Sequence, residues 1–236
     1  IVTIVEMADR VMNRTVDPQI SEYYLNLHQS YGVKFHFNTS LETINKSSDS
    51  LEVVCSDGTE VKADSVLIGA GVIPNIELAE DAGIHCDNGI IVDEFGRTNF
   101  ANVYACGDCT NHPNKILNKN LRLESVHNAM EQAKTVASSV LNNPMEYSQV
   151  PWFWSDQYDH KLQIVGLSGD HDLVTMRGNT NDAKFMLFYT KDEELIAVDA
   201  INNPKEFLIS RKLVANKVKI KPDLICDLNT NLNDLI

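Results

Sequence analysis

The stretch Ile1–Asn38 decides the fold class; it reads IVTIVEMADRVMNRTVDPQISEYYLNLHQSYGVKFHFN. Ile1–Val5 is a short apolar run that predicts a buried strand. Asp17 and Pro18 predict a helix start, because an Asp side chain caps free amides and Pro lacks an amide that the first turn would leave unpaired. Val33–Asn38 predicts a second strand. Strand, helix and strand in this order form a unit of a parallel sheet, so we expect an α/β fold.

Glycine marks two places in the segment that follows. Asp57 and Gly58 lie between two alternating runs and predict a hairpin turn. Asp64–Ile68 predicts a further strand, which runs into Gly69 and Gly71. Glycine at such a strand end permits a tight backbone path or the close approach of a ligand.

One long helix is expected in the middle of the chain. Leu123–Leu141 has a helical pattern that places five residues on one face: Val126, Met130, Ala133, Ala137 and Val140. A shorter helix is predicted at Ile76–Ala82, and short strands are predicted at Ile90–Val92 and Val103–Ala105.

After Pro151 the pattern changes to clustered aromatic residues, short strands and a helix at Pro204–Asn216. The predicted strands are Leu162–Leu167, Leu173–Arg177, Phe185–Thr190 and Leu195–Ala200. Strands and a helix without regular alternation predict a separate α+β module.

Composition argues against several classes of partner. The 236 residues carry 20 basic and 33 acidic side chains, which gives a net charge of −13. Nucleic acids and anionic membrane surfaces both attract concentrated basic charge, so we expect neither as a partner. No apolar run approaches the roughly 20 residues that span a bilayer, and the N-terminus lacks the basic segment and cleavage site of a signal peptide.

Cysteine is sparse and odd in number: Cys55, Cys86, Cys106, Cys109 and Cys226. This is no disulfide framework, and it indicates a reducing cytoplasm. Cys106 and Cys109 form a CxxC motif, but zinc would need a second ligand pair that the sequence lacks, so we expect no metal site. A thioredoxin-like dithiol is an alternative. Two small buried residues beside a tight turn are the favoured interpretation.

Acidic residues at strand ends are the candidate ligand contacts. Glu6 follows the first predicted strand, where a carboxylate can bind an adenosine ribose, although a solvated Glu is favoured without a preceding glycine fingerprint. Asp108 ends a strand and can accept hydrogen bonds from a polyol, or it caps a turn. The segment Arg122–Val126 offers an anion-facing helix N-terminus, or Ser125 is a simple cap. No catalytic triad and no P-loop occurs.

Five motifs follow one another along the chain: VTIVE (Val2–Glu6), GAGVIPN (Gly69–Asn75), YACGDCTNHPN (Tyr104–Asn114), RLESVHNAMEQA (Arg122–Ala133) and PWFWSDQY (Pro151–Tyr158). As a set, they resemble the FAD-dependent ferredoxin reductases of oxygenase systems, the group of the putidaredoxin, rhodocoxin and rubredoxin reductases. The resemblance covers essentially the whole chain, and PWFWSDQY is the most selective motif.

The resemblance implies three parts. Residues 1–72 would be a partial, Rossmann-like NAD-binding domain, residues 73–148 the returning segment of the FAD-binding domain, and residues 149–236 a C-terminal interface domain. Family members begin with an FAD-binding segment and an NAD glycine fingerprint, and the resemblance implies that both precede Ile1. Because the chain starts without Met inside a predicted strand, we expect this chain alone to be incomplete as an enzyme.

The resemblance also implies roles for residues at the NAD site. Glu6 matches the acid that binds the ribose, which would favour NADH over NADPH. Gly69 and Gly71 match the glycines where the chain crosses from the NAD domain to the FAD domain.

A second group of residues matches the flavin site. Asp108 matches the Asp that holds the ribityl chain of FAD, and Gly107 lets the backbone pass close to it. Val126 matches the helix-start residue at the pyrimidine end of the flavin. Trp154 matches an aromatic residue near the flavin and the partner-docking surface, and Lys134 matches a basic residue that faces acidic ferredoxin.

The implied function is electron transfer from NADH through FAD to a ferredoxin- or rubredoxin-type acceptor, with no protein residue as catalytic acid or base. Two alternatives stay open: an NADH-dependent flavoprotein with a small-molecule acceptor, and a truncated fragment without bound cofactor. An oligomeric assembly also stays open. A second basic cluster, which a solvated surface would equally explain, is formed by Arg211, Lys212, Lys217, Lys219 and Lys221.

Overall fold

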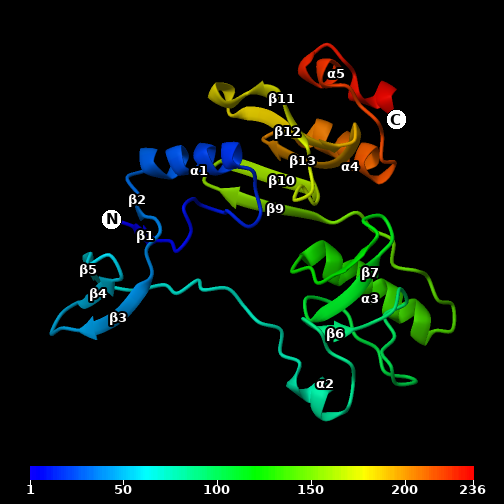
Figure 1. Cartoon of the computed structure of the whole chain (residues 1–236), viewed down its shortest axis with the longest axis horizontal. Coiled ribbons are helices and arrows are strands. Elements are labelled where there is room, and N and C mark those ends of the chain that lie inside the picture. The colour runs from blue at the N-terminus through cyan, green and yellow to red at the C-terminus, as the bar shows by residue number, and fades with distance from the viewer. The chain divides into compact units, whose positions relative to one another are not determined.

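A computed structural model describes all 236 residues, which form two compact units, Ile1–Gly71 and Val72–Ile236 (Figure 1). The first unit contains β1 (Thr3–Val5), α1 (Pro18–Ser30), β2 (Lys34–His36), β3 (Leu41–Lys46), β4 (Leu51–Cys55) and β5 (Glu60–Ala63). β1 and β2 pair in parallel, whereas β3, β4 and β5 form an antiparallel sheet.

The parallel pairing of β1 with β2 confirms the α/β unit predicted at the start of the chain. Thr3 lies opposite Lys34 in this pair. The Asp17 carboxylate accepts a hydrogen bond from the Gln19 amide at 2.8 Å, and Pro18 is the first helical residue of α1. Two local signals, a capping side chain and an imino acid, therefore fix where α1 begins.

The hairpin predicted at Asp57 and Gly58 is present between β4 and β5. The Asp57 carboxylate accepts a hydrogen bond from the Thr59 amide at 2.9 Å, and Gly58 has a φ of +81°. A positive φ favours glycine, because other residues carry a Cβ that approaches the backbone there.

The strand predicted at Asp64–Ile68 is wrong. β5 ends at Ala63, no strand follows it before β6, and Leu67 is 97% exposed. A strand is held by hydrogen bonds to a neighbouring strand, and no strand of the structure pairs with this segment. Residues 64–68 therefore have the apolar composition of a strand but no neighbouring strand to pair with.

The second unit begins with α2 (Glu77–Asp81), β6 (Ile90–Ile91), β7 (Thr110–Asn114), β8 (Lys119–Leu121) and α3 (Val126–Val140). β7 is the middle strand of its sheet, parallel to β6 and antiparallel to β8. The strand predicted at Val103–Ala105 is reduced to an isolated bridge between Arg97 and Tyr104. Two backbone hydrogen bonds flank this bridge, from the Thr98 amide to the Val103 carbonyl and from the Ala105 amide to the Gly96 carbonyl, both at 3.0 Å.

Helix α3 buries its polar face and exposes its apolar face. Its buried residues are all polar: Asn128, Gln132, Thr135, Ser138 and Ser139. The apolar face that the sequence shows is exposed instead, with Val126 at 59%, Met130 at 57% and Val140 at 58%. Strand β7 also presents buried polar side chains, and one hydrogen bond joins it to this face of α3, from the Thr110 hydroxyl to Gln132 Oε1 at 2.8 Å.

The part of the second unit after Pro151 is an antiparallel sheet with two α-helices, which confirms the predicted α+β module. Its elements are β9 (Trp152–Gln157), β10 (His160–Gly166), β11 (Leu173–Asn179), β12 (Lys184–Lys191), β13 (Glu194–Ile201), α4 (Pro204–Ala215) and α5 (Pro222–Cys226). The strand order is β11-β12-β13-β10-β9, and α4 packs on β13 and β10 (Figure 1). No helix in the chain has the length and apolar character needed to cross a membrane.

Arg177 on β11 fastens the end of the chain to this sheet. Its side chain is 3% exposed and pairs with Glu206 of α4 at 2.7 Å. The guanidinium also donates to the carbonyl oxygens of Ile225, Asp227 and Thr230, at 3.0, 2.6 and 3.0 Å. A buried guanidinium needs an acceptor for each of its N–H donors. The Glu206 carboxylate accepts only some of these hydrogen bonds, and the three backbone carbonyls accept others.

We expect Arg177→Met to lower the free energy of unfolding by about 3–5 kcal/mol, because it leaves the Glu206 carboxylate without its buried partner. Urea denaturation measures this loss. Lys161→Met is the control, since its ion pair with Asp156 is exposed and should contribute no more than about 1 kcal/mol. Equal losses in the two variants would contradict the role of Arg177.

The same pair predicts how stability depends on pH. Burial raises the pKa of Glu206, but the hydrogen bonds and charge of Arg177 outweigh burial, and the pKa lies below its ordinary value. A lowered pKa stabilises the fold above the pKa of the unfolded chain, and the contribution is lost as pH falls through the folded value. Glu206→Gln should therefore remove part of the acid-induced loss of stability.

Candidate functional site

The Gln132 side chain of α3 holds the turn between Gly107 and Thr110. Gly107 has a φ of +90°, and its buried amide donates to the Gln132 Oε1 at 2.6 Å. The Thr110 hydroxyl lies 2.8 Å from the same oxygen, and the Thr110 amide donates to the Gly107 carbonyl at 3.0 Å. A single buried amide oxygen therefore fixes both ends of the turn to the helix.

Asp108 lies at the exposed part of this turn. Its carbonyl oxygen accepts a hydrogen bond from Arg122 Nη1 at 3.2 Å, and the same nitrogen pairs with Glu124 at 2.6 Å. No group of the chain hydrogen-bonds the Asp108 carboxylate. The backbone is thus anchored at several points while the carboxylate stays available to hydroxyl groups of a ligand.

The N-terminus of α3 is the second element of the site. The Ser125 Oγ accepts a hydrogen bond from the Asn128 amide at 3.4 Å and donates to the Trp152 carbonyl at 3.2 Å. This confirms the capping role of Ser125. Val126 is the first helical residue, and its side chain is 59% exposed. The positive end of the helix dipole therefore opens to solvent at Val126, where it favours negative charge.

An aromatic cluster lies beside this helix N-terminus. The Trp152 ring is 5.1 Å from the ring of Trp154, 5.0 Å from the guanidinium carbon of Arg211 and 5.4 Å from the ring of His127. Trp154 is 41% exposed and forms the outer edge. Burial lowers the pKa of His127 and the charge of Arg211 lowers it further, so the ring is neutral at pH 7.

The sequence did not single out His127 or Trp152 individually, and it placed Arg211 only in a basic run. Their proximity depends on the packing of α3, β9 and α4, which no local spacing encodes. The PWFWSDQY motif is the signal that could have found Trp152, because the ring lies two residues before Trp154 on the same face of β9.

Lys134 is exposed on α3 but is not an isolated charge. Its Nζ lies 2.6 Å from Glu131 Oε1, one turn earlier in the helix. An exposed intrahelical pair of this kind adds little stability, and it reduces the positive field that Lys134 presents.

In the first unit, Glu6 follows β1 directly, at the carboxyl end of the parallel pair. Its Oε1 accepts a hydrogen bond from the Ala8 amide at 2.8 Å, and its amide donates to the His36 carbonyl at 2.9 Å. These bonds fix one carboxylate oxygen and leave the second free of bonds within the chain.

Gly69 and Gly71 lie in the exposed segment after β5. An added Cβ would meet nothing within 4 Å at either position, and only Gly71 has a positive φ, at +85°. The structure therefore shows no close approach at these glycines. Their role at the crossing between domains stays a prediction.

A buried polar layer under α3 was not expected from the sequence. The rings of His112 and Tyr147 meet edge to face at 4.9 Å, and the Tyr147 hydroxyl donates to Asn128 Oδ1 at 2.8 Å. Burial raises the pKa of Tyr147 to about 12 and lowers the pKa of His112, so both groups are uncharged. This layer is buried and uncharged, so it is no candidate for proton transfer at the surface.

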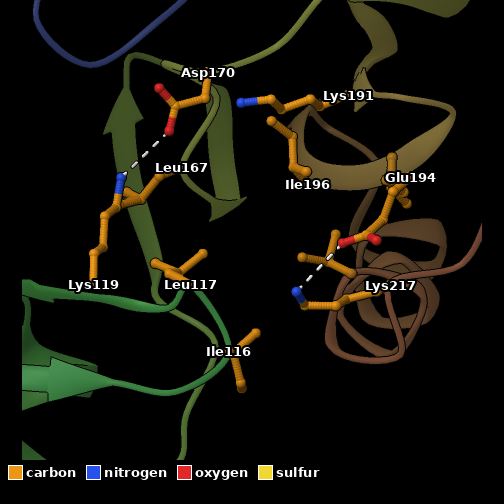
Figure 2. Close-up of a pocket in the computed structure, with 11 residues that line it drawn as sticks. Ile116, Leu117, Lys119, Leu167, Asp170, Lys191, Glu194, Ile196 and Lys217 are labelled. Atoms are coloured by element: carbon orange, nitrogen blue, oxygen red, sulfur yellow. Dashed lines mark ion pairs between the residues drawn. The ribbon is translucent and has the colours of Figure 1, made fainter.

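A pocket of about 180 Å³ lies elsewhere in the second unit, between the β7–β8 turn and the C-terminal sheet (Figure 2). Ile116, Leu117 and Ile196 are among its apolar residues. Its rim carries two ion pairs, Lys119 with Asp170 at 3.7 Å and Lys217 with Glu194 at 3.4 Å. None of the predicted site residues lines it, and no cluster of three potential metal ligands occurs in the chain.

Two family models match the chain. The pyridine nucleotide-disulphide oxidoreductase model matches residues 1–133, and the reductase C-terminal model matches residues 152–236.

Curated relatives extend well beyond the matched region. The chain is 36% identical to putidaredoxin reductase CamA of Pseudomonas putida, over 100% of the chain and 56% of the relative. It is 37% identical to rhodocoxin reductase of Rhodococcus erythropolis, over 98% of the chain and 54% of the relative. The chain therefore spans about half the length of the curated relatives it matches.

Solved structures agree with these matches. A ferredoxin reductase from Rhodopseudomonas palustris has a TM-score of 0.94 and 37% identity, covering 98% of this chain and 58% of that one. The covalent complex of putidaredoxin reductase with putidaredoxin gives a TM-score of 0.94 and 36% identity, with 99% and 57% covered.

We expect Gln132→Met to release the turn, because the buried Gly107 amide loses its acceptor at a cost of about 1–3 kcal/mol. Hydrogen exchange at the Gly107 amide should accelerate by roughly tenfold or more, since each 1.4 kcal/mol changes an equilibrium about tenfold. Ser139→Ala is the matched control: its hydroxyl is on the same buried helix face and donates to Phe95 at 2.9 Å. Equal acceleration in both variants would indicate a general loosening of α3.

Proposed function

Because the chain belongs to the pyridine nucleotide-disulphide oxidoreductase family, we propose that it is part of a flavoprotein reductase. The enzyme passes electrons from NADH through FAD to a ferredoxin- or rubredoxin-type protein. The observation that carries the proposal is the rigid connection between the Asp108 turn and the N-terminus of α3, which Gln132 provides.

The residues present fit two neighbouring parts of FAD, the ribityl chain and the pyrimidine side of the flavin ring. The Asp108 carboxylate has no partner in the chain and can accept hydrogen bonds from the ribityl hydroxyls. The open N-terminus of α3 at Val126 can face the pyrimidine carbonyls, which are electron-rich and become more so on reduction. Gly107 supports this arrangement, because its positive φ and buried amide bring the backbone to Asp108 in one fixed conformation.

FAD would supply the hydride acceptor for NADH and release electrons singly to the protein partner. This chain's own residues bind and orient: Asp108 fixes the polyol, Val126 and the helix dipole balance charge at the ring, and Trp154 covers the approach to it. No acid or base of the chain needs to act on the hydride, because the cofactors would supply the redox chemistry.

The domain assignment is part of the proposal. Residues 1–72 belong to the NAD-binding domain, with Gly69 and Gly71 at the crossing, residues 73–148 return to the FAD-binding domain, and residues 149–236 form the interface domain. The sparse and odd number of cysteines supports a cytoplasmic location, where a reducing environment keeps thiols unpaired.

The docking surface for the partner is formed by Trp154, Lys134 and Arg211. Its support is the exposed edge of Trp154 and the position of Arg211 on the Trp152 ring. The net charge of −13 repels an acidic partner, so attraction must come from a local basic surface. The pairing of Lys134 with Glu131 moderates this attraction.

The first test concerns the choice of nucleotide. In an enzyme that contains this chain, Glu6→Ala should reduce the preference for NADH over NADPH. The carboxylate would accept hydrogen bonds from the ribose hydroxyls, which contribute about 1.5–3 kcal/mol, and would repel a 2′-phosphate. The ratio of kcat/KM for the two nucleotides measures the change. Glu22→Ala, on the exposed face of α1, should leave the ratio unchanged. An unchanged ratio in Glu6→Ala would make Glu6 a surface residue without a role.

The second test concerns the protein acceptor and decides the proposed function. Lys134→Glu should slow NADH-dependent reduction of an acidic iron–sulfur partner, most strongly at low salt, where screening is weakest. Reduction of ferricyanide by the same variant should change little, because that reaction needs no protein docking.

Lys115→Glu is the control for Lys134→Glu. Lys115 is 58% exposed, compared with 60% for Lys134, and is likewise ion-paired, with Glu146 at 2.7 Å. It should leave both reactions unchanged. A wild-type enzyme that reduces ferricyanide but no iron–sulfur protein would refute the proposed partner class, and equal losses with both acceptors in Lys134→Glu would refute the docking role.

A further inference from the structure

Two cysteines flank the turn that presents Asp108. Cys106 precedes Gly107 and is exposed, whereas Cys109 follows Asp108 and is half-buried. The Cys109 Sγ lies 3.8 Å from the carbonyl oxygen of Cys106. The sulfur of the second cysteine is thus folded back onto the backbone of the first.

The separation of these two cysteines is fixed by the fold. Gln132 Oε1 binds the Gly107 amide and lies within hydrogen-bond distance of the Thr110 hydroxyl. Each of these anchored residues is the direct neighbour of one cysteine. The backbone positions of the two cysteines are therefore restrained relative to each other, which favours reaction between their thiols over reaction with a second molecule.

The two thiols also influence each other electrostatically. Partial desolvation of the largely exposed Cys106 thiol raises its pKa, and negative charge on Cys109 raises it further. The interaction between charges weakens with distance, so this effect agrees with the proximity of the two sulfurs. One thiolate beside one thiol is the combination that thiol–disulfide exchange uses.

The other three cysteines do not compete for this pairing. Cys55 is 1% exposed, in β4. Cys86 directs its sulfur to the Ile84 carbonyl at 3.5 Å, and Cys226 directs its sulfur to the Met176 carbonyl at 3.6 Å. Neither lies at CxxC spacing from another cysteine.

We propose that Cys106 and Cys109 are a redox-active dithiol that closes to an intramolecular disulfide around Gly107 and Asp108. The oxidant is a small-molecule disulfide such as oxidised glutathione. A cysteine thiolate attacks one of its sulfurs, forms a mixed disulfide and releases one glutathione thiolate. The second cysteine loses its proton, attacks the cysteine sulfur of the mixed disulfide and releases the second glutathione. The protein loses two electrons and two protons, and one oxidised glutathione becomes two reduced ones.

The disulfide would change how the turn presents Asp108. It closes a ring of four residues, and the Asp108 carboxylate lies at the tip of that ring. Closing so short a ring ties the Cys109 backbone to the Cys106 backbone, which Gly107 can follow because its positive φ carries no side-chain strain. The inference goes beyond the proposed reductase function and does not depend on it, because it needs neither FAD nor a protein partner.

The test uses the chain itself, equilibrated with mixtures of reduced and oxidised glutathione, then acid-quenched, alkylated and analysed by peptide mass spectrometry. The peptide that contains both cysteines should lose two hydrogens and take up no alkylating reagent, and two glutathione molecules should be released per chain. The rate should rise with pH, because the thiolate is the attacking species.

Cys106→Ser and Cys109→Ser should each stop at the mixed disulfide on the remaining cysteine. Cys226→Ser is the control and should close the disulfide as the wild type does. Thermal denaturation of the reduced variants checks that the serine substitutions leave the fold intact. Two thiols that stay open to alkylation in the wild type under oxidising glutathione, or that each keep a glutathionyl group, would overturn the proposal.

Discussion

The amide oxygen of Gln132 is the contact on which the candidate site depends. It reaches 25 positions back along the chain to the Gly107 amide and also approaches the Thr110 hydroxyl. This contact attaches the Gly107–Thr110 turn to α3. The turn needs it because β7 follows the turn but no strand directly precedes it. In the proposed flavin site, Asp108 would contribute only its carboxylate, and Gln132 would act indirectly by fixing the turn that carries it.

The buried polar face of α3 lowers the hydrophobic stabilisation of the helix but makes its packing more specific. Buried amides and hydroxyls require partners, and a helix that packs through Asn128 and Gln132 gains less from the hydrophobic effect than one that packs through Val126 and Met130. Directional bonds, however, allow only one register between helix and strand, whereas apolar packing tolerates small slips. The second unit therefore trades some stability for a fixed relation between the turn and the helix N-terminus.

Sequence reasoning succeeded where the cause of a structure is local. Asp17 caps α1, and Asp57 with Gly58 forms a hairpin, because each of these features needs only neighbouring residues. The α/β class and the C-terminal α+β module could be predicted for the same reason. The strand at Asp64–Ile68 failed, since its formation depends on a partner strand far away in the sequence.

The candidate site likewise contains residues that local motifs predict and residues that only tertiary packing brings together. The residue types at Asp108 and at the start of α3 were visible as motifs. In the structure, Gln132 of α3 binds the turn that carries Asp108. The contacts of Trp152 with Arg211 and His127 were not visible, because three separate elements bring them together. Nor could the sequence show that Glu131 partly neutralises Lys134, since a single helical spacing fits both paired and unpaired rotamers.

The fastening of the tail by Arg177 has a consequence for the order in which this protein folds during synthesis. Chains emerge from the ribosome N-terminus first, and β11 with its guanidinium is complete some fifty residues before the Ile225, Asp227 and Thr230 carbonyls that bind it. Until those residues emerge, closing the sheet over Arg177 would bury donors without acceptors. We therefore expect the sheet around Arg177 to stay open to chaperones during translation and to close only when the segment from Ile225 to Thr230 is free.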